Sequence, residues 1–560
     1  MRKLLVTVLL LIGTPLAGTL VAQEVTYQRL LNADKEPHNW LNYYRTYNGQ
    51  RYSPLDQITK SNVRRLVPVW AFQTGDVEGG LQTTPLVADG VMYLSSSWNR
   101  IFALDATTGR RIWQYNYEKP KKVAALYSPW NRGVALANGL VFMGTIDNHM
   151  LAIDAKTGRE VWNVEVEDPE QCGCNITGAP LVVKDKVLAG VTGGDAFHRG
   201  YINAFDVKTG RQAWRFWTIP APGEPGNDTW SGDSWKYGGG SAWTTGSYDP
   251  DLNLVYWSIG NPAADFYGQN RKGKNLYTDS VVALDADTGK LKWYNQQIPN
   301  DVWDFDTAYE NVLIDVNHQG RPRKLLVNVN KSGITWVLDR TNGNFISSWP
   351  AIENFNFIKG VDNEGNLLGR NEPPLDTPTL ICPAIAGGRS WNHGAFNPKN
   401  GWFYTTGLEW CMEMISRRQE PKEGQAAFGG EFKMKPPPKG EPGGHLGAYD
   451  PITGKVHWMY KSKYPLLASQ LVTAGGLMFT GDAEGKFFAL DADTGKELWG
   501  FMTGSGNRGS PISYGVKGRQ YIATPSGWGS ALAGLMPQIW PETENFRPGS
   551  AVFVFALPEN

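Results

Sequence analysis

The sequence lacks an excess of charge of either sign. Its 54 Lys and Arg residues balance 54 Asp and Glu residues, so the formal net charge is zero. Proteins that bind the phosphate backbone of nucleic acids or an anionic membrane surface typically have a basic surface. The composition therefore excludes both kinds of partner, and a hydrophobic content of 41% excludes a disordered chain.

Long hydrophobic runs are also missing. The one apolar run near the N-terminus, residues 4–12, follows Arg2 and Lys3 and is shorter than the ~20 residues of a membrane-spanning helix. Small residues follow up to Ala22. We expect residues 1–22 to be a secretory signal peptide cleaved near Ala22, and residues 23–560 to be one exported domain that does not span a membrane.

Cysteine is scarce, and two common motifs are absent. There is no CxxCH for covalent haem c and no GxSxG of a serine hydrolase. In an exported protein the four cysteines can form disulfides. We predict a structural disulfide between Cys382 and Cys411, whereas Cys172 and Cys174 form either a small ring or two free thiols.

Glycine and tryptophan, in contrast, are abundant, with 64 and 23 residues, and they recur in one repeated pattern. The pattern is ALDxxTGxxxW, a strand, a tight turn made by Asp and Gly, and a second strand that ends in Trp. Copies begin at Ala103, Ala152, Ala204, Ala283, Ala448 and Ala489, with a looser copy at Val337.

Each copy follows another hairpin, so the repeating unit has four strands. An eighth first hairpin begins at Ser510, but only one strand, near the C-terminus, follows it. Residues 67–76 offer the missing strand with its Trp. The sequence therefore predicts an all-β fold, an eight-bladed β-propeller of four-stranded antiparallel blades, with the ring closed by an N-terminal strand.

The tryptophans at the repeat position are explained by packing between blades. Function is expected where the repeat is interrupted, because insertions on a propeller usually gather on one face. The interruptions are residues 220–240, 261–279, 350–392 and 412–444.

Two short segments that stand out from the repeat contain possible metal ligands. In Trp303-Asp304-Phe305-Asp306, alternation along an extended strand would direct both carboxylates to the same side. Asn261 ends a strand one blade earlier. Two carboxylates and an amide oxygen suit a hard cation such as Ca²⁺. The alternative is that Asp304 and Asp306 are solvated turn residues.

The repeats, together with GGGSAW at 238–243, GNP at 260–262 and NDVWDFD at 300–306, resemble the quinoprotein alcohol dehydrogenases that use pyrroloquinoline quinone (PQQ). The resemblance extends from about Tyr43 to the C-terminus. It implies an eight-bladed propeller with the quinone near its axis, and it favours the functional interpretation of Asp304.

The resemblance also assigns roles to residues that match the family's motifs. Trp243 corresponds to the floor on which the quinone stacks, Asp304 to the catalytic base, and Lys331 to the cation beside the reactive quinone oxygens. The remaining expected quinone contacts are Gln82, Arg132, Thr177, Thr192, Gly193, Gly194, Ser241, Ser390 and Trp528. The metal ligands correspond to Asp195, Asn261 and Asp304.

Asp306 indicates which metal is bound. Calcium-dependent members of the family have Ala or Ser two residues after the base, whereas lanthanide-dependent members have Asp, as here. Asp195, Asp304 and Asp306 together match a trivalent ion better than a divalent one. We therefore expect a lanthanide in preference to Ca²⁺, with Asp306 as a fourth ligand. Asp195 replaces the usual Glu, and Cys172 and Cys174 lie near Thr177, where a disulfide would be close to the quinone.

The implied activity is oxidation of a primary alcohol to an aldehyde in the periplasm. Because the chain contains no haem motif, a separate periplasmic c-type cytochrome is the expected electron acceptor. Members of the family occur alone, as dimers or with a small subunit, so a homodimer is one of the expected oligomeric states. The alternative function is a non-catalytic propeller scaffold of the outer-membrane assembly type. Such a scaffold would not need Trp243, Asn261, Asp304 and Lys331 together, and it commonly has a lipid-attachment Cys, which does not follow the apolar run here.

Overall fold

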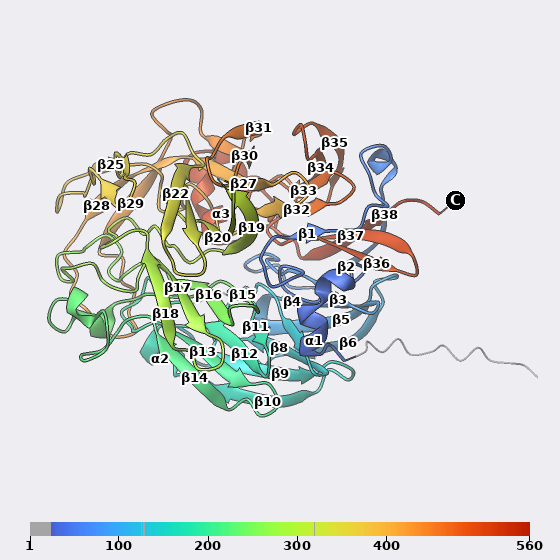
Figure 1. Ribbon diagram of the computed structural model, residues 1–560, viewed down its shortest axis with the longest axis horizontal. Coiled ribbons are helices and arrows are strands. Elements are labelled where there is room, and N and C mark those ends of the chain that lie inside the picture. The colour runs from blue at the N-terminus through green and yellow to red at the C-terminus, as the bar shows by residue number, and fades with distance from the viewer. Residues whose placement is uncertain (1–23, 125, 127–128, 319, 560) are drawn as a thin grey trace, which may run out of the picture.

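A computed structural model describes residues 24–124, 126, 129–318 and 320–559. The predicted signal peptide, residues 1–22, lies outside the described residues. Strands dominate the fold (Figure 1), and the α-helices of the described part are short: α1 (Tyr27–Leu31), α2 (Pro169–Cys172) and α3 (Ala531–Leu535). None of the helices in these ranges is long and apolar enough to cross a lipid bilayer.

The strands form four-stranded antiparallel sheets that follow one another along the chain, as the repeats predict. The first four sheets are β3 (Leu86–Ala88), β4 (Val91–Ser96), β5 (Arg100–Asp105) and β6 (Arg111–Asn116); β7 (Ala135–Ala137), β8 (Leu140–Gly144), β9 (His149–Asp154) and β10 (Glu160–Glu165); β11 (Leu181–Val183), β12 (Lys186–Gly190), β13 (Tyr201–Asp206) and β14 (Gln212–Trp217); and β15 (Ser247–Asp249), β16 (Leu254–Ser258), β17 (Ser280–Asp285) and β18 (Leu291–Gln296).

The later sheets have the same strand order, and one gains a parallel edge strand. They are β19 (Val312–His318), β20 (Arg321–Val329), β21 (Ile334–Asp339) and β22 (Phe345–Pro350); β26 (Ala395–Asn397), β27 (Trp402–Glu409), β30 (Gly443–Tyr449) and β31 (Val456–Ser462); β32 (Leu471–Thr473), β33 (Leu477–Gly481), β34 (Lys486–Asp491) and β35 (Glu497–Met502), with β1 (Tyr52–Ser53) at the edge; and β36 (Ile512–Val516), β37 (Arg519–Ser526), β38 (Ala551–Ala556) and β2 (Val67–Gln73). This arrangement is a β-propeller, and the predicted all-β class is confirmed.

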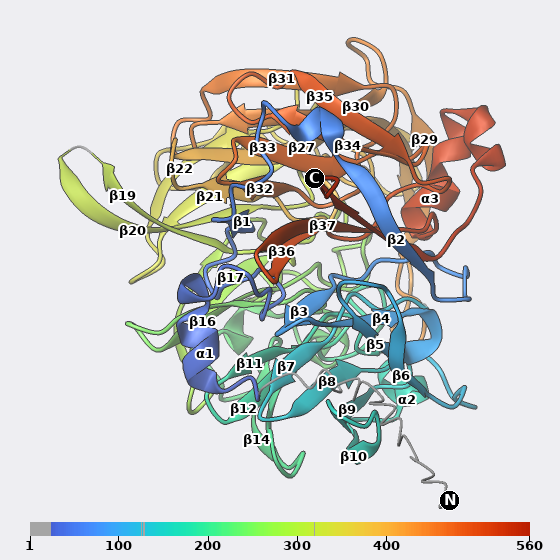
Figure 2. The same cartoon turned by 90° about the vertical axis from the view of Figure 1, so that its right-hand side faces the viewer.

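The first and last parts of the chain meet in one sheet. β2 pairs antiparallel with β38, and Figures 1 and 2 show the blue strand beside the red C-terminal strands. Trp70 of β2 then packs on Gly109 of the sheet formed by β3 to β6, and its Nε1 donates a hydrogen bond to the carbonyl of Ala106. The last sheet therefore contacts the first through a strand from the N-terminal part of the chain.

The same contact joins most of the other neighbouring sheets. In one example, the Trp214 ring of β14 covers Gly289 in the turn after β17, and Trp214 Nε1 donates to the carbonyl of Ala286. Asp285 shapes that turn by accepting hydrogen bonds from the amide and the hydroxyl of Thr288. Equivalent ring-on-glycine pairs are Trp113 with Gly158, Trp162 with Gly210, Trp293 with Gly343, Trp349 with Gly454 and Trp458 with Gly495. The inferred packing role of the repeated tryptophans is confirmed for these positions.

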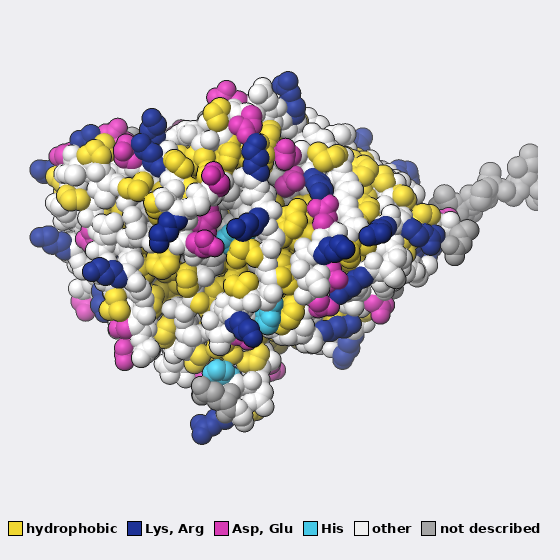
Figure 3. All heavy atoms as spheres, turned by 90° about the horizontal axis from the view of Figure 1, so that it is seen from above, with side chains coloured by type: hydrophobic (Ala, Val, Ile, Leu, Met, Phe, Trp, Pro, Cys, Tyr) yellow, Lys and Arg dark blue, Asp and Glu magenta, His cyan; other side chains and the backbone are white. Residues whose placement is uncertain are grey.

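The insertions contain further strands and contact one another. β23 (Gly360–Val361) pairs with β24 (Leu367–Leu368), and β25 (Thr379–Ile381), β28 (Cys411–Ser416) and β29 (Gly430–Lys435) form a small sheet. Phe266, in the 261–279 insertion, donates its amide to the carbonyl of Phe428 and accepts a hydrogen bond from the Ser416 hydroxyl. On the face in Figure 3, acidic, basic and hydrophobic side chains are interspersed, consistent with the balanced composition.

The ring-on-glycine contact can be tested with Gly289→Ala. The φ of Gly289 is +69°, and a Cβ there would lie 2.5 Å from the Trp214 ring. We expect a loss of folding free energy of about 2–4 kcal/mol, from the unfavourable backbone and from overpacking. The matched control is Gly401→Ala, at φ +74° with no atom within 4 Å of the added Cβ among the described residues, for which about 1 kcal/mol is expected. Equal shifts of the melting temperature would contradict the role of the tryptophan.

Candidate active site

Segments from several sheets converge on one internal cavity of about 210 Å³. Most of the lining residues directly precede the first strand of a sheet or follow its second strand, which places them together at the centre of the propeller. The lining includes the predicted residues Gln82, Arg132, Thr177, Thr192, Gly193, Gly194, Asp195, Ser241, Trp243, Asp306, Lys331 and Ser390. Trp528 is not among the lining residues, although Ser530 is, and the centre of the Trp528 ring lies 5.9 Å from that of Phe546. Its contact with the quinone stays a prediction.

The cavity wall presents buried polar atoms that lack a partner. Within the described residues, Gln82 Oε1, Arg132 Nε, Asn175 Nδ2, Ser390 Oγ and Arg508 Nε make no hydrogen bond. An unsatisfied buried polar group costs about 1–3 kcal/mol, so such groups are rarely left together without a ligand or water. A compact polar ligand with acceptor groups would satisfy the two guanidinium groups and the amide.

Trp243 lies at one wall of this cavity. The Arg132 guanidinium carbon is 4.7 Å from the centre of the Trp243 ring and 4.7 Å from that of Trp391. Trp243 Nε1 donates to Asp306 Oδ1 at 3.3 Å, and the ring packs edge-on against Tyr309. These contacts fix the plane of the indole ring before any ligand binds.

Beside the tryptophan, carboxylates from three separate segments converge. One oxygen each of Asp195, Asp265 and Asp304 lies within 4.8 Å of the others. Asn261 stands between two of them, and its Nδ2 donates to Asp195 Oδ1 at 3.3 Å and to Asp265 Oδ1 at 2.9 Å. The predicted ligands Asp195, Asn261 and Asp304 therefore lie together.

Asp306 has a different environment from the other predicted ligands. Its Oδ1 accepts hydrogen bonds from Trp243 Nε1 and from the backbone amide of Asn261, and its Oδ2 accepts one from Lys331. It lies outside the group of three carboxylates described above. Its role as a metal ligand stays a prediction.

Lys331 connects two of the three carboxylates of the NDVWDFD segment. Its Nζ is 2.7 Å from Asp304 Oδ2 and 3.2 Å from Asp306 Oδ2. Burial by itself would lower the pKa of Lys331, but the carboxylates of Asp304 and Asp306 raise it well above the usual value. The ammonium group is therefore charged at neutral pH.

Burial raises the pKa of the carboxylates in the cluster. The pKa of Asp304 is raised well above its usual value by burial and by the neighbouring Asp195 and Asp306, while Lys331 opposes the shift. The pKa of Asp265 is raised well above its usual value by burial and by Asp195 and Asp304. Burial and Asp306 also raise the pKa of Asp195. Buried like charges at such short range are costly unless a cation compensates them.

The backbone around Asp304 differs from the sequence prediction. Residues 301–310, all of them described, form no strand, and Asp304 has a left-handed φ of +64°. The predicted alternation along an extended strand is wrong. Asp301 instead organises a loop by accepting hydrogen bonds from the amides of Trp303 and Phe305, and this loop brings Asp304 and Asp306 to Lys331.

Sequence reasoning missed several residues of the site. Asp265 follows the recognised GNP motif by three residues. The only feature of the sequence that could have indicated its role is a carboxylate so close to that motif. Asn175, Tyr309, Trp391 and Arg508 also line the cavity. They belong to no recognised motif, so their position could be found only from the fold.

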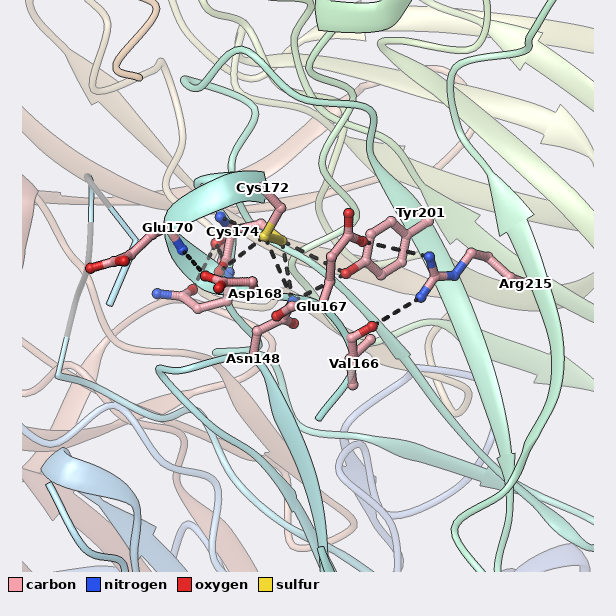
Figure 4. The surroundings of a disulfide bond; sticks show 11 residues. Asn148, Val166, Glu167, Asp168, Glu170, Cys172, Cys174, Tyr201 and Arg215 are labelled. Carbon is pink, nitrogen blue, oxygen red and sulfur yellow. Dashed lines mark hydrogen bonds and ion pairs between the residues drawn. A yellow bond between two sulfur atoms is a disulfide. The ribbon is translucent and has the colours of Figure 1, made fainter. Parts of the chain in front are cut away.

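Both pairs of cysteines form disulfides in the structure. Cys382 and Cys411 are joined as predicted, which ties the segment around β25 to β28. Cys172 and Cys174 form the small ring (Figure 4), where Asn148 Nδ2 lies 3.4 Å from Cys174 Sγ and donates to the Tyr201 hydroxyl. The ring sits next to the cavity rather than in its wall, because Asn175 and Thr177 line the cavity and the two cysteines do not.

Comparison with known proteins agrees with this site. Residues 40–354 and 460–522 match the PQQ family of glucose, ethanol and alcohol dehydrogenase β-propeller domains. The quinoprotein alcohol dehydrogenase PedH of Pseudomonas putida is 36% identical over 584 residues, covering 100% of this chain and 97% of that protein. The lanthanide-dependent methanol dehydrogenase of Methylacidiphilum fumariolicum is 35% identical, covering 94% of this chain and 90% of that protein.

A solved structure is similar over the same extent. A europium-containing methanol dehydrogenase superposes with a TM-score of 0.89 at 34% identity, covering 95% of this chain and 100% of that one. The fold and the cavity define a quinoprotein β-propeller. Within that class, the chain belongs to the family of PQQ-dependent alcohol dehydrogenases.

The position of Trp243 can be tested with Trp243→Ala. We expect PQQ affinity to fall by about 10- to 100-fold, because a planar ligand loses an aromatic surface. Titration of the purified protein with PQQ, followed by tryptophan fluorescence, measures the change. Trp402→Ala is the control, since Trp402 stacks on His457 away from the cavity. An unchanged affinity in Trp243→Ala would rule out the stacking role.

Proposed function

We propose that the chain oxidises a primary alcohol to an aldehyde in the periplasm, using PQQ and a bound lanthanide ion, and passes electrons to a c-type cytochrome. The observation that supports this most directly is the close group of Asp195, Asp265 and Asp304, of which Asp265 and Asp304 are buried, beside a cavity lined by unpartnered polar atoms. We further propose that the sheets are the eight blades of one ring closed by β2, and that residues 1–22 direct export.

The residues present fit a hard metal ion. Asn261 Oδ1 and Asp304 Oδ1 are buried and unpartnered among the described residues, and both are oxygen donors of the kind that such ions prefer. In this proposal Asp195, Asn261, Asp304 and Asp306 hold the ion. A trivalent ion is favoured because the site concentrates negative charge around one ammonium group.

The cavity likewise fits PQQ. Arg132 and Arg508 have open donor positions for acidic groups, and Asn175 Nδ2 offers a neutral one. Arg132 also donates to the Thr177 hydroxyl, which fixes its guanidinium over Trp243. Bound PQQ supplies a carbonyl that accepts a hydride, and a bound metal ion supplies Lewis-acid polarisation.

Asp304 is the residue best placed to remove the hydroxyl proton of the alcohol. Its Oδ1 has no hydrogen-bond partner in the described chain, whereas its Oδ2 is held by Lys331. Burial raises the pKa of Asp304, whereas Lys331 lowers it, as a bound cation would. The positive charges keep the carboxylate ionised and therefore able to accept a proton. The nearby Lys331 ammonium limits the shift and stabilises negative charge that develops beside it.

A scaffold function makes no use of these features. A non-catalytic propeller gains no stability from buried carboxylates in close contact, because replacing buried charges with apolar residues is often neutral or stabilising. The site therefore favours catalysis over the scaffold alternative.

The role of Asp304 predicts the effect of Asp304→Asn. Asn tolerates the left-handed backbone at this position, so the variant removes the base with little strain. With PQQ, La³⁺ and a primary alcohol, we expect dye reduction to fall by about 10²–10⁴-fold, while the absorbance of bound PQQ is retained. Turnover at the wild-type rate would refute the assigned base.

The choice of metal is tested by reconstitution. Metal-free protein is loaded with PQQ plus either La³⁺ or Ca²⁺ and assayed on a panel of primary alcohols. We expect activity with La³⁺ and little with Ca²⁺, because the carboxylates require more positive charge than a divalent ion supplies. Activity with Ca²⁺ alone would contradict the lanthanide assignment, and inactivity towards every alcohol with both ions would contradict the proposed activity.

A further inference from the structure

We propose that the Asp265 carboxylate is a direct ligand of the metal ion, in addition to the ligands inferred from the family motifs. The inference rests on the proposed function only in that a cation occupies the space between Asp195 and Asp304. It names a carboxylate that no recognised motif contains.

The first support is the spacing of the oxygens. Hard cations of this size hold oxygen ligands at about 2.3–2.6 Å, so two ligands of one ion lie no more than about 5 Å apart. One oxygen of Asp265 satisfies this limit with both Asp195 and Asp304, since all three lie within 4.8 Å of one another.

The second support is a set of open lone pairs. Asp265 Oδ2, Asn261 Oδ1 and Asp304 Oδ1 are buried, and none of them has a hydrogen-bond partner in the described part of the chain. Asp265 is 0% exposed, so water at the surface cannot satisfy its Oδ2. A cation between the three residues would satisfy all three oxygens at once.

A purely structural role for Asp265 does not account for both of its oxygens. Oδ1 accepts a hydrogen bond from Asn261 Nδ2 at 2.9 Å, which orients the amide and leaves Asn261 Oδ1 open. That role requires one oxygen only. The second oxygen is left buried and unpartnered, which a ligand role explains.

The backbone fixes Asp265 relative to the other carboxylates. The Ala427 amide donates to the carbonyl of Asp195, and the Ala427 carbonyl accepts from the amide of Asp265, each at 2.8–2.9 Å. On the other side, Arg271 Nη2 donates to the carbonyls of Ala264 and Asp301. The segments that contain Asp195, Asp265 and Asp304 are therefore tied together independently of a metal.

The charge of Asp265 bears on which ion is selected. Lys331 contacts Asp304 and Asp306, whereas Asp265 belongs to the group that it forms with Asp195 and Asp304. When ionised, Asp265 adds one negative charge to that group. It therefore favours a cation of higher charge, such as La³⁺, over Ca²⁺.

Europium luminescence tests the ligand directly. Eu³⁺ is added to the full-length mature protein, with and without PQQ, and luminescence lifetimes in H₂O and D₂O give the number of coordinated waters. We expect Asp265→Ala to bind Eu³⁺ with at least about tenfold weaker affinity and with one more coordinated water than the wild type. Asp265→Asn, which keeps the size and the bond to Asn261, should also lose affinity and should bind La³⁺ less selectively over Ca²⁺.

Asp279→Asn is the matched control. Asp279 is also a buried carboxylate near the cluster, but it lies outside the group of three. We expect Eu³⁺ bound to Asp279→Asn to have the same number of coordinated waters as Eu³⁺ bound to the wild type. The melting temperature of each metal-free variant shows whether it is folded. An unchanged water count and affinity in both Asp265 variants would overturn the inference.

The readout needs no turnover, so the two proposals fail separately. If the Asp265 variants bind Eu³⁺ more weakly and with one more water, but the protein oxidises no alcohol, Asp265 is a metal ligand and the proposed function is wrong. If the protein oxidises alcohols and the Asp265 variants show unchanged Eu³⁺ hydration, the proposed function holds and Asp265 is not a ligand.

Discussion

Most neighbouring sheets are held together by a tryptophan ring that covers the glycine of the next sheet's turn, and the residues at the central cavity lie on segments that join the strands of these sheets. A side chain at the turn would collide with the ring, as at Gly289 under Trp214. The segments that contain Arg132, Trp243 and Lys331 belong to sheets that are joined by this contact, and they meet at one cavity.

The site itself brings together carboxylates that repel one another. Carboxylates from separate segments lie within reach of one another, and burial raises the pKa of Asp195, Asp265 and Asp304. Hydrogen bonds of the Ala427 backbone, of the Arg271 guanidinium and of the Asp301 carboxylate hold this arrangement in place. The strain of like charges is thus tolerated because the surrounding framework is rigid, and it is relieved by Lys331 and by the cation that the site is suited to bind.

Much of this organisation could be predicted before the structure. The spacing of the ALDxxTGxxxW repeats predicted the four-stranded units, and the GGGSAW and NDVWDFD motifs singled out Trp243 and Asp304. The prediction failed where local conformation mattered. An extended strand was expected at Asp304, whereas Asp301 accepts two backbone hydrogen bonds there and forms a loop. Asp265 was missed because an Asp three residues after GNP has no distinctive pattern, and only the loop around Ala427 brings it beside Asp195.

The sequence by itself determined the repeating unit, the packing role of its tryptophans and the residue types available for chemistry, because these depend on local periodicity and on side-chain properties. Only the tertiary structure decided which carboxylates share a site, that Cys172 and Cys174 are joined, and that Arg132 lies over Trp243. Those relations join residues tens to hundreds of positions apart or depend on loop conformation. They are fixed by how the sheets pack around the centre, which no local pattern encodes.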